Sequence, residues 1–138
     1  MKKIREFVRL VFITIRFFIL TKVYKMDISS KARISFGAIL DKTNPSGIHI
    51  KEDSYVASGA IIFSHDFSRN IHADTIIGKR CFIGANSIIM PGIIIGDEVL
   101  IGAGAVVTKN VPSNSIAAGN PAKVIREGIH TGKFGQLL

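Results

Sequence analysis

The chain has 138 residues, a length that suits one domain with a single core. Its net charge of +8 is unevenly placed, because residues 1–25 hold seven basic residues and one acid, which is +6 of the total. The rest of the chain is almost neutral, which argues against a nucleic-acid footprint spread over the body. The single cysteine, Cys81, excludes an internal disulfide framework.

Residues 4–20 have the pattern of a helix with Arg5, Arg9 and Arg16 on one face. Because arginines interrupt the apolar run and no small-residue cleavage site follows, a spanning helix or a signal peptide is disfavoured. We expect residues 1–25 to form a basic amphipathic helix. Two interpretations stay open: it lies on an anionic membrane surface, or it packs against another subunit.

The centre of the chain is a hexapeptide repeat. From Ile77 to Pro112 six hexads follow without a gap, and a large β-branched residue opens each one. A period of six fits neither a helix nor a long alternating strand, but it is typical of a parallel β-helix built from short strands and corners. Gly or Asn tolerates the left-handed backbone of a corner. These types fill four fourth places, namely Asn86, Gly92, Gly104 and Asn110.

The same register extends back to Ile28, with two breaks. Blocks 28–45 and 50–67 each hold three hexads, and block 77–112 holds six, so the sequence predicts about four coils over residues 28–112. The second break predicts a loop at residues 68–76, and residues 113–138 form a C-terminal arm. Loops on a rigid scaffold are common places for function. Cys81 falls at an inward position, which favours a buried structural thiol.

His65 is the leading candidate for chemistry. It takes the fourth place of its hexad beside the loop, so it should lie at an outer corner, where a neutral imidazole can act as a general base. The alternative is a histidine chosen only because it tolerates a left-handed corner. Asp66 either orients the imidazole or is only a corner acid. No pair of histidines has a spacing that argues for a metal site, so we expect none.

Ser64-His65-Asp66 followed by a loop resembles the catalytic segment of sugar and polysaccharide O-acetyltransferases, which are hexapeptide-repeat acyltransferases. The resemblance implies a left-handed parallel β-helix, acetyl-CoA as co-substrate without a metal, and His65 as the base that deprotonates an acceptor hydroxyl. It also implies a homotrimer with each active site between two copies. The loop residues expected to contact the acceptor are Arg69, Asn70 and His72.

Two further segments, residues 101–109 and 117–126, resemble the coenzyme A edge of the same family. Ala85 precedes Ala103 by 18 residues, or one coil, so both should line one edge along which a pantetheine arm can lie. The resemblance places cations near the phosphates of the cofactor. The expected residues are Thr108, Lys109, Lys123 and Arg126, although Lys109 taken alone also fits a solvated corner.

The sequence therefore predicts an acetyl-CoA-dependent O-acetyltransferase acting on a sugar hydroxyl of a cell-surface glycan or its precursor. We expect it in the cytoplasm, with possible peripheral contact to the inner face of the membrane through residues 1–25. The enzymatic alternatives are a serine O-acetyltransferase and an amino-sugar N-acetyltransferase. The non-enzymatic alternative is a β-helix that serves as an assembly scaffold.

Overall fold

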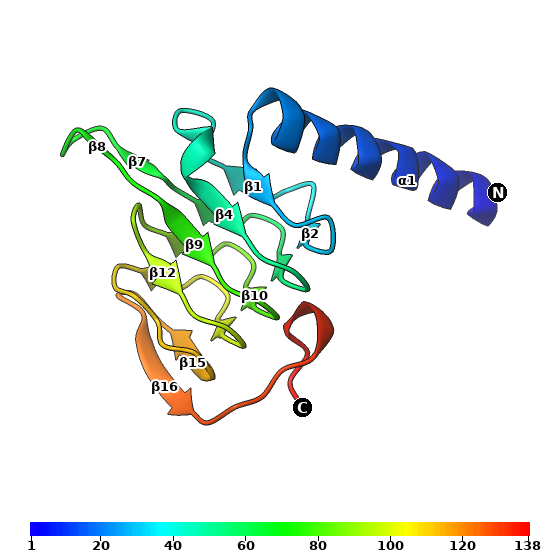
Figure 1. The fold of residues 1–138 in the computed structure, drawn as a ribbon. Coiled ribbons are helices and arrows are strands. Elements are labelled where there is room, and N and C mark those ends of the chain that lie inside the picture. Colours follow the sequence, from blue (N-terminus) through cyan, green and yellow to red (C-terminus); the bar gives the residue numbers. More distant parts are fainter.

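The computed structural model describes residues 1–138 and consists of a helix followed by a three-faced parallel β-helix (Figure 1). The helix α1 (Lys2–Phe18) continues into a π-helical segment η1 (Ile19–Val23), and the strands then visit three faces in turn. Face A contains β1 (Asp27–Ile28), β4 (Ile48–Ile50), β9 (Thr75–Ile77) and β12 (Ile94–Ile95). Face C contains β3 (Ile39–Leu40), β6 (Ile61–Ile62), β11 (Ile88–Ile89) and β14 (Val106–Val107).

Face B has six strands, and its last two lie at the C-terminal end of the prism. Its parallel members are β2 (Arg33–Ile34), β5 (Tyr55–Val56), β10 (Phe82–Ile83), β13 (Leu100–Ile101) and β15 (Ser115–Ala118). The last strand, β16 (Lys123–Glu127), pairs antiparallel with β15. Val111 also bridges to Ile95 on face A, so the chain begins a fifth coil after the four that were expected. The prism therefore continues past residue 112, into the segment expected to be the C-terminal arm.

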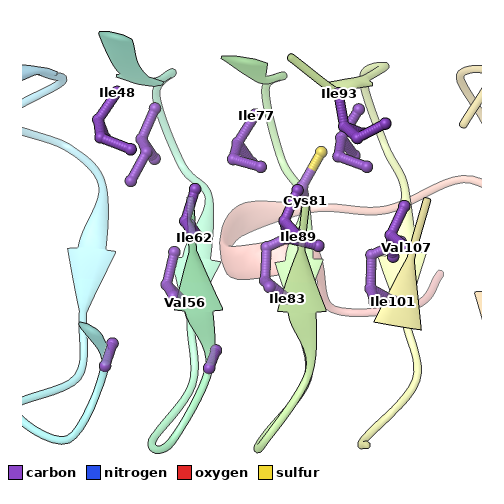
Figure 2. Packing of buried hydrophobic residues seen from close by; sticks show 14 of the residues in the cluster. Ile48, Val56, Ile62, Ile77, Cys81, Ile83, Ile89, Ile93, Ile101 and Val107 are labelled. Carbon is purple, nitrogen blue, oxygen red and sulfur yellow. The ribbon is translucent and has the colours of Figure 1, made fainter. Parts of the chain in front are cut away.

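The hexad openers form the core, as the repeat predicted. They stack as ladders along the inside of the prism (Figure 2). Register pairs such as Ile77 with Ile95 and Ile83 with Ile101 put each opener above its equivalent in the next coil. Each buried aliphatic side chain contributes about 1.5–3 kcal/mol, so these ladders are the main stabilising element. Cys81 is fully buried in the same core, and burial raises the pKa of its thiol to about 11.

The corners use the left-handed backbone more widely than the Gly and Asn pattern indicated. Arg80 and Glu98 take positive φ values of 51° and 54°, in addition to Asn86 at 58°. Their amides donate to carbonyls of the neighbouring coil, since Arg80 N binds Glu52 O and Glu98 N binds Lys79 O. These bonds offset the strain of the conformation. At Gly59, which has a φ of 77°, glycine is required for a second reason, because a Cβ there would lie 1.9 Å from Asn86 Oδ1.

The two breaks in the register are built differently. The first contains a short 3₁₀ helix, η2 (Pro45–Gly47). At the second, β7 (His65–Asp66) and β8 (Ile71–His72) form an antiparallel hairpin that projects from the corner between faces C and A (Figure 1). Face A resumes with β9 at Thr75, so the loop expected over residues 68–76 consists of the hairpin tip, its second strand and the start of β9.

Candidate active site

A groove of about 750 Å³ lies where the end of α1 meets face C. Phe12 and Ile15 line it from the helix, while Ile39 and Ile61 line it from β3 and β6. The lining is mostly apolar, and its titratable side chains are Arg16, Tyr24, Asp41, Lys42 and His65. An apolar cleft with a few convergent polar groups is the usual form of a small-molecule site.

The imidazole of His65 is held by a buried carboxylate. His65 Nδ1 lies 2.5 Å from Asp41 Oδ2, and the side chain of Asp41 is only 3 % exposed. Because a carboxylate of this kind only accepts hydrogen bonds, Nδ1 carries the proton of the neutral ring and Nε2 carries the lone pair. Nε2 makes no hydrogen bond within the chain, and it is therefore the nitrogen available to accept a proton from a substrate.

Asp41 is fixed from several directions. Its Oδ2 also accepts the amides of Ser64 at 2.9 Å and His65 at 3.0 Å, and its Oδ1 accepts the amide of Thr43 at 3.0 Å. Burial alone would raise the pKa of Asp41, but the hydrogen bonds from Ser64, His65 and Thr43 outweigh it and lower the pKa below its ordinary value. The residue stays ionised, and its geometry fixes both the tautomer and the orientation of the ring.

Asp66 does not contact the imidazole of His65, so it is not the acid that orients the ring. Asp66 Oδ1 accepts the Ser68 hydroxyl at 2.7 Å, and Oδ2 lies 2.6 Å from Arg69 Nε. These bonds lower the pKa of Asp66 to about 2. Asp66 thus organises the turn between β7 and β8, and Asp41 is the acid that contacts His65.

The three loop residues expected near the acceptor all lie in the hairpin. His72 is opposite His65 in the β7–β8 register, with ring centroids 6.2 Å apart. Arg69 and Asn70 form the exposed tip, and Asn70 has a positive φ of 51°. His65 itself does not take a positive φ, which removes the interpretation of a histidine chosen to fit a left-handed corner. The structure therefore brings His72 to His65 and leaves Arg69 at the rim.

The residues expected at the cofactor edge divide between two corners. Ala85 and Ala103 stack at the corner between faces B and C, as predicted, and Ala85 O accepts the amide of Gly104 at 2.8 Å. Lys123 joins them, because it pairs with Ala118 at the end of β15, above Gly102. Thr108 and Lys109 follow β14 and lie at the corner between faces C and A, two coils beyond His65.

Arg126 is further along β16, opposite Ile116, and is exposed. One copy of the chain therefore gathers Ala85, Ala103 and Lys123 on one edge, and His65 with Lys109 along another. Face C separates the two edges. No group of three or more His, Cys, Asp or Glu side chains has the arrangement of a metal site.

Sequence reasoning missed Asp41. A signal was present in the register, because Leu40 stacks under Ile62, which places Asp41 at the corner directly beneath the His65 segment. Asp41 directly follows β3, and the His65 segment follows β6, the equivalent strand of the next coil. An acid at that equivalent position is the signal that could have identified it.

Comparisons with known proteins find similar sequences among acetyltransferases. A family model for the hexapeptide repeat of succinyl-transferase matches residues 74–109. The putative lipopolysaccharide biosynthesis O-acetyl transferase WbbJ of Escherichia coli (strain K12) is 32 % identical over 105 residues, covering 63 % of this chain and 54 % of the relative. Across the first four curated relatives, the chain spans between 25 % and 54 % of their length.

Two solved structures extend the likeness to the fold. A maltose O-acetyltransferase from Clostridium difficile 630 has a TM-score of 0.58 and 28 % identity, over 73 % of this chain and 68 % of that one. AntD, an N-acyltransferase from Bacillus cereus in complex with dTDP and 3-hydroxybutyryl-CoA, has a TM-score of 0.64 and 25 % identity, over 75 % and 63 %. These matches confirm the resemblance to the hexapeptide-repeat acyltransferases and the predicted left-handed parallel β-helix.

Proposed function

We propose that this protein is an acetyl-CoA-dependent O-acetyltransferase that acts on a sugar hydroxyl of a cell-surface glycan or its precursor. The observation that carries the proposal is the His65 imidazole, with Nδ1 bound to the buried Asp41 and Nε2 unoccupied beside an apolar groove. The O-acetyltransferases among the similar proteins support the reaction and the acceptor class.

The reaction follows from that geometry. Nε2 of His65 takes the proton of the acceptor hydroxyl as its oxygen attacks the thioester carbonyl carbon. The tetrahedral intermediate collapses, the carbon–sulfur bond breaks, and the departing thiolate receives the proton from the imidazolium. Asp41 stabilises the positive charge that His65 acquires between the two proton transfers. Acetyl moves from sulfur to oxygen, and His65 returns to its neutral form.

The division of the site between two corners supports the expected homotrimer. In one copy, the edge with Ala85 and Ala103 lies across face C from His65, so a cofactor on that edge needs an imidazole from elsewhere. Three prisms packed side by side would set the His65 corner of one copy against the Ala103 edge of the next. Each site would then have two walls, from different copies.

The first test is turnover of acetyl-CoA against a panel of sugars with free hydroxyls. His65→Ala should lower kcat by about 10²-fold or more, because general-base assistance is of that size. The circular dichroism spectrum should stay unchanged, since His65 lies outside the core. A folded variant that keeps most of its rate would show that His65 is not the base.

The second test examines the shared site. As a trimer of one variant, His65→Ala is expected to be nearly inactive. Ala103→Leu is expected to lose several-fold of its rate when acetyl-CoA is kept below the wild-type KM. Refolding them together in equal amounts should restore about a quarter of the wild-type activity, because a quarter of the interfaces then pair an intact His65 with an intact Ala103 edge. Light scattering that shows an active monomer, or mixing that restores no activity, would contradict the shared site.

An amino-sugar N-acyl transfer is the second candidate, favoured by the similarity to AntD. The same base serves either acceptor, so amino sugars and their hydroxyl analogues belong in one panel. Faster turnover of the amines would select N-acylation, and turnover of neither class would favour the scaffold alternative.

A further inference from the structure

The N-terminal helix exposes almost all of its apolar side chains. No residue of α1 is buried, and its side chains from Met1 to Ile15 are all exposed. Phe7 and Phe18 are 67 % and 59 % exposed. The helix projects from the end of the prism (Figure 1). A lone helix of this length is only marginally stable in water, so an amphipathic helix of this kind needs a surface that covers its apolar side.

One residue sets the orientation of α1. The guanidinium of Arg16 donates to the carbonyls of Ser35 at 2.5 Å and Ala38 at 3.0 Å, and it lies over the ring of Phe36. At 100° per residue, Arg5 and Arg9 share the side of Arg16, while Phe7, Val11 and Phe18 lie on the opposite side. The anchor therefore turns the arginine side toward the prism and the apolar side away from it.

The charges of the chain indicate what covers that apolar side. Residues 1–25 carry +6, so a suitable surface should be anionic. A second copy of the chain offers little net negative charge, because its residues 26–138 carry 11 basic residues against nine acids, which is +2, and most of those acids already have partners within the fold. His49 binds Asp27 and Asp74, His65 binds Asp41, Arg69 binds Asp66, Lys79 binds Glu52, Arg80 binds Glu98, and the Lys79 amide binds Asp97.

We propose that α1 docks on an anionic lipid surface, with Phe7, Val11 and Phe18 entering the boundary between headgroups and acyl chains. A helix with an apolar side, flanked by Lys and Arg, binds such a surface in its plane. Lys3 flanks the apolar side and would face the phosphate layer, while Lys2, Arg5 and Arg9 lie on the opposite, polar side of the helix and add to the attraction by the surface potential. None of the helices has both the length and the apolar character needed to span a bilayer.

This docking has a consequence for the groove beside His65. Phe12, Ile15 and Ile19 line that groove and belong to the same helical segment as the docking residues. The groove lies on the side of the helix that meets the prism, so docking would hold it about one helix diameter, ~10 Å, from the lipid surface. If the proposed function holds, an acceptor carried on a lipid headgroup would meet the groove there.

The test is co-sedimentation of the full chain with vesicles of phosphatidylcholine alone or mixed with phosphatidylglycerol. The variant is Phe7→Gln with Val11→Gln, which keeps the net charge and removes apolar area from the docking side. Ile125→Gln on β16 is the matched control, because Ile125 is 67 % exposed, as Phe7 is. Circular dichroism checks the fold of each protein, and light scattering without lipid gives its oligomeric state.

We expect the wild type to bind the mixed vesicles at least about tenfold more tightly than the neutral ones, and to be released as salt rises. The double variant should lose at least about tenfold of that binding, while Ile125→Gln should stay within about twofold. Equal binding to both vesicle types, or equal binding of the double variant and the control, would overturn the proposal. A double variant that dissociates into smaller oligomers would also overturn it, because another copy would then be the covering surface.

Discussion

Replacing Asp41 by Asn tests the link between the buried carboxylate and the reaction. The substitution keeps the size of the side chain but removes its charge and one of its acceptor atoms. Asp41 accepts four hydrogen bonds, three of them on Oδ2, and the Asn amide group would meet a donor where Asp41 now accepts. We expect kcat to fall about 10²-fold or more, because the imidazole loses its partner and its fixed tautomer.

The same change has a cost in stability. Hydrogen bonds to charged groups contribute about 1.5–3 kcal/mol, which for a chain of this size corresponds to a loss in Tm of roughly 5–10 °C. Activity is therefore measured well below the lowered Tm, with circular dichroism as the check on folding. A purely structural role would reduce the amount of folded enzyme and leave kcat per folded molecule unchanged, whereas a positioning role lowers kcat while the KM for acetyl-CoA stays within a few fold.

Asp66→Asn is the matched control. Asp66 is next to His65 in the sequence, but it binds Ser68 and Arg69 instead of the imidazole. We expect it to change kcat by less than about tenfold. If Asp41→Asn keeps kcat near the wild-type value, or if Asp66→Asn loses more activity than Asp41→Asn, the assignment of Asp41 as the positioning residue is wrong.

Two further predictions concern the cofactor edge and pH. Ala103→Leu should raise the KM for acetyl-CoA several-fold by filling the edge, and Lys123→Ala should do the same by removing a cation, while the KM for the acceptor should change less. Calorimetry with coenzyme A measures the affinity of both variants. Wild-type affinity in both would mean that the cofactor binds at another edge. Burial would lower the pKa of His49, but hydrogen bonds to Asp27 and Asp74 outweigh it and raise the pKa. Protonated His49 therefore stabilises the folded state fully below pH 6.5, its ordinary pKa, and this contribution is lost as pH rises through the folded pKa. His49→Gln should therefore lower Tm at pH 5.5 by an amount corresponding to about 0.2–1 kcal/mol and change Tm little at pH 9. An equal loss of Tm at both pH values would show that the charge of His49 is not what stabilises the fold.

The coils were predictable because their cause is local and repeated. Each hexad opener, such as Ile83, must face inward wherever the period holds, so a single sequence is enough to find the ladder. The corners were less predictable. Arg80 and Glu98 adopt a left-handed backbone that their residue types disfavour, because hydrogen bonds from neighbouring coils hold them there. Such bonds depend on stacking, which residue propensity does not describe.

The candidate site divides in the same way. His65 was predictable from its unusual type at a corner position, and Ala85 and Ala103 were predictable from their spacing of one coil. Asp41 was not found, because its partner lies 24 residues away, a separation that includes an insertion as well as a coil. The start of a fifth coil was also missed, since residues 113–118 lack the hexad pattern that identified the first four.

The C-terminal tail changes how the prism should unfold. After β16 the chain runs back along the corner between faces A and B (Figure 1), where the Ile129 amide binds Asn114 O and the Thr131 hydroxyl binds Arg80 O. The Phe134 amide then reaches Asp53 O in the second coil. A stack of coils with only neighbouring contacts loses its end units one at a time. Here the last segment bridges the second coil to the fifth, so fraying at the C-terminal end requires contacts in four coils to break together, and the repeat melts as one cooperative unit.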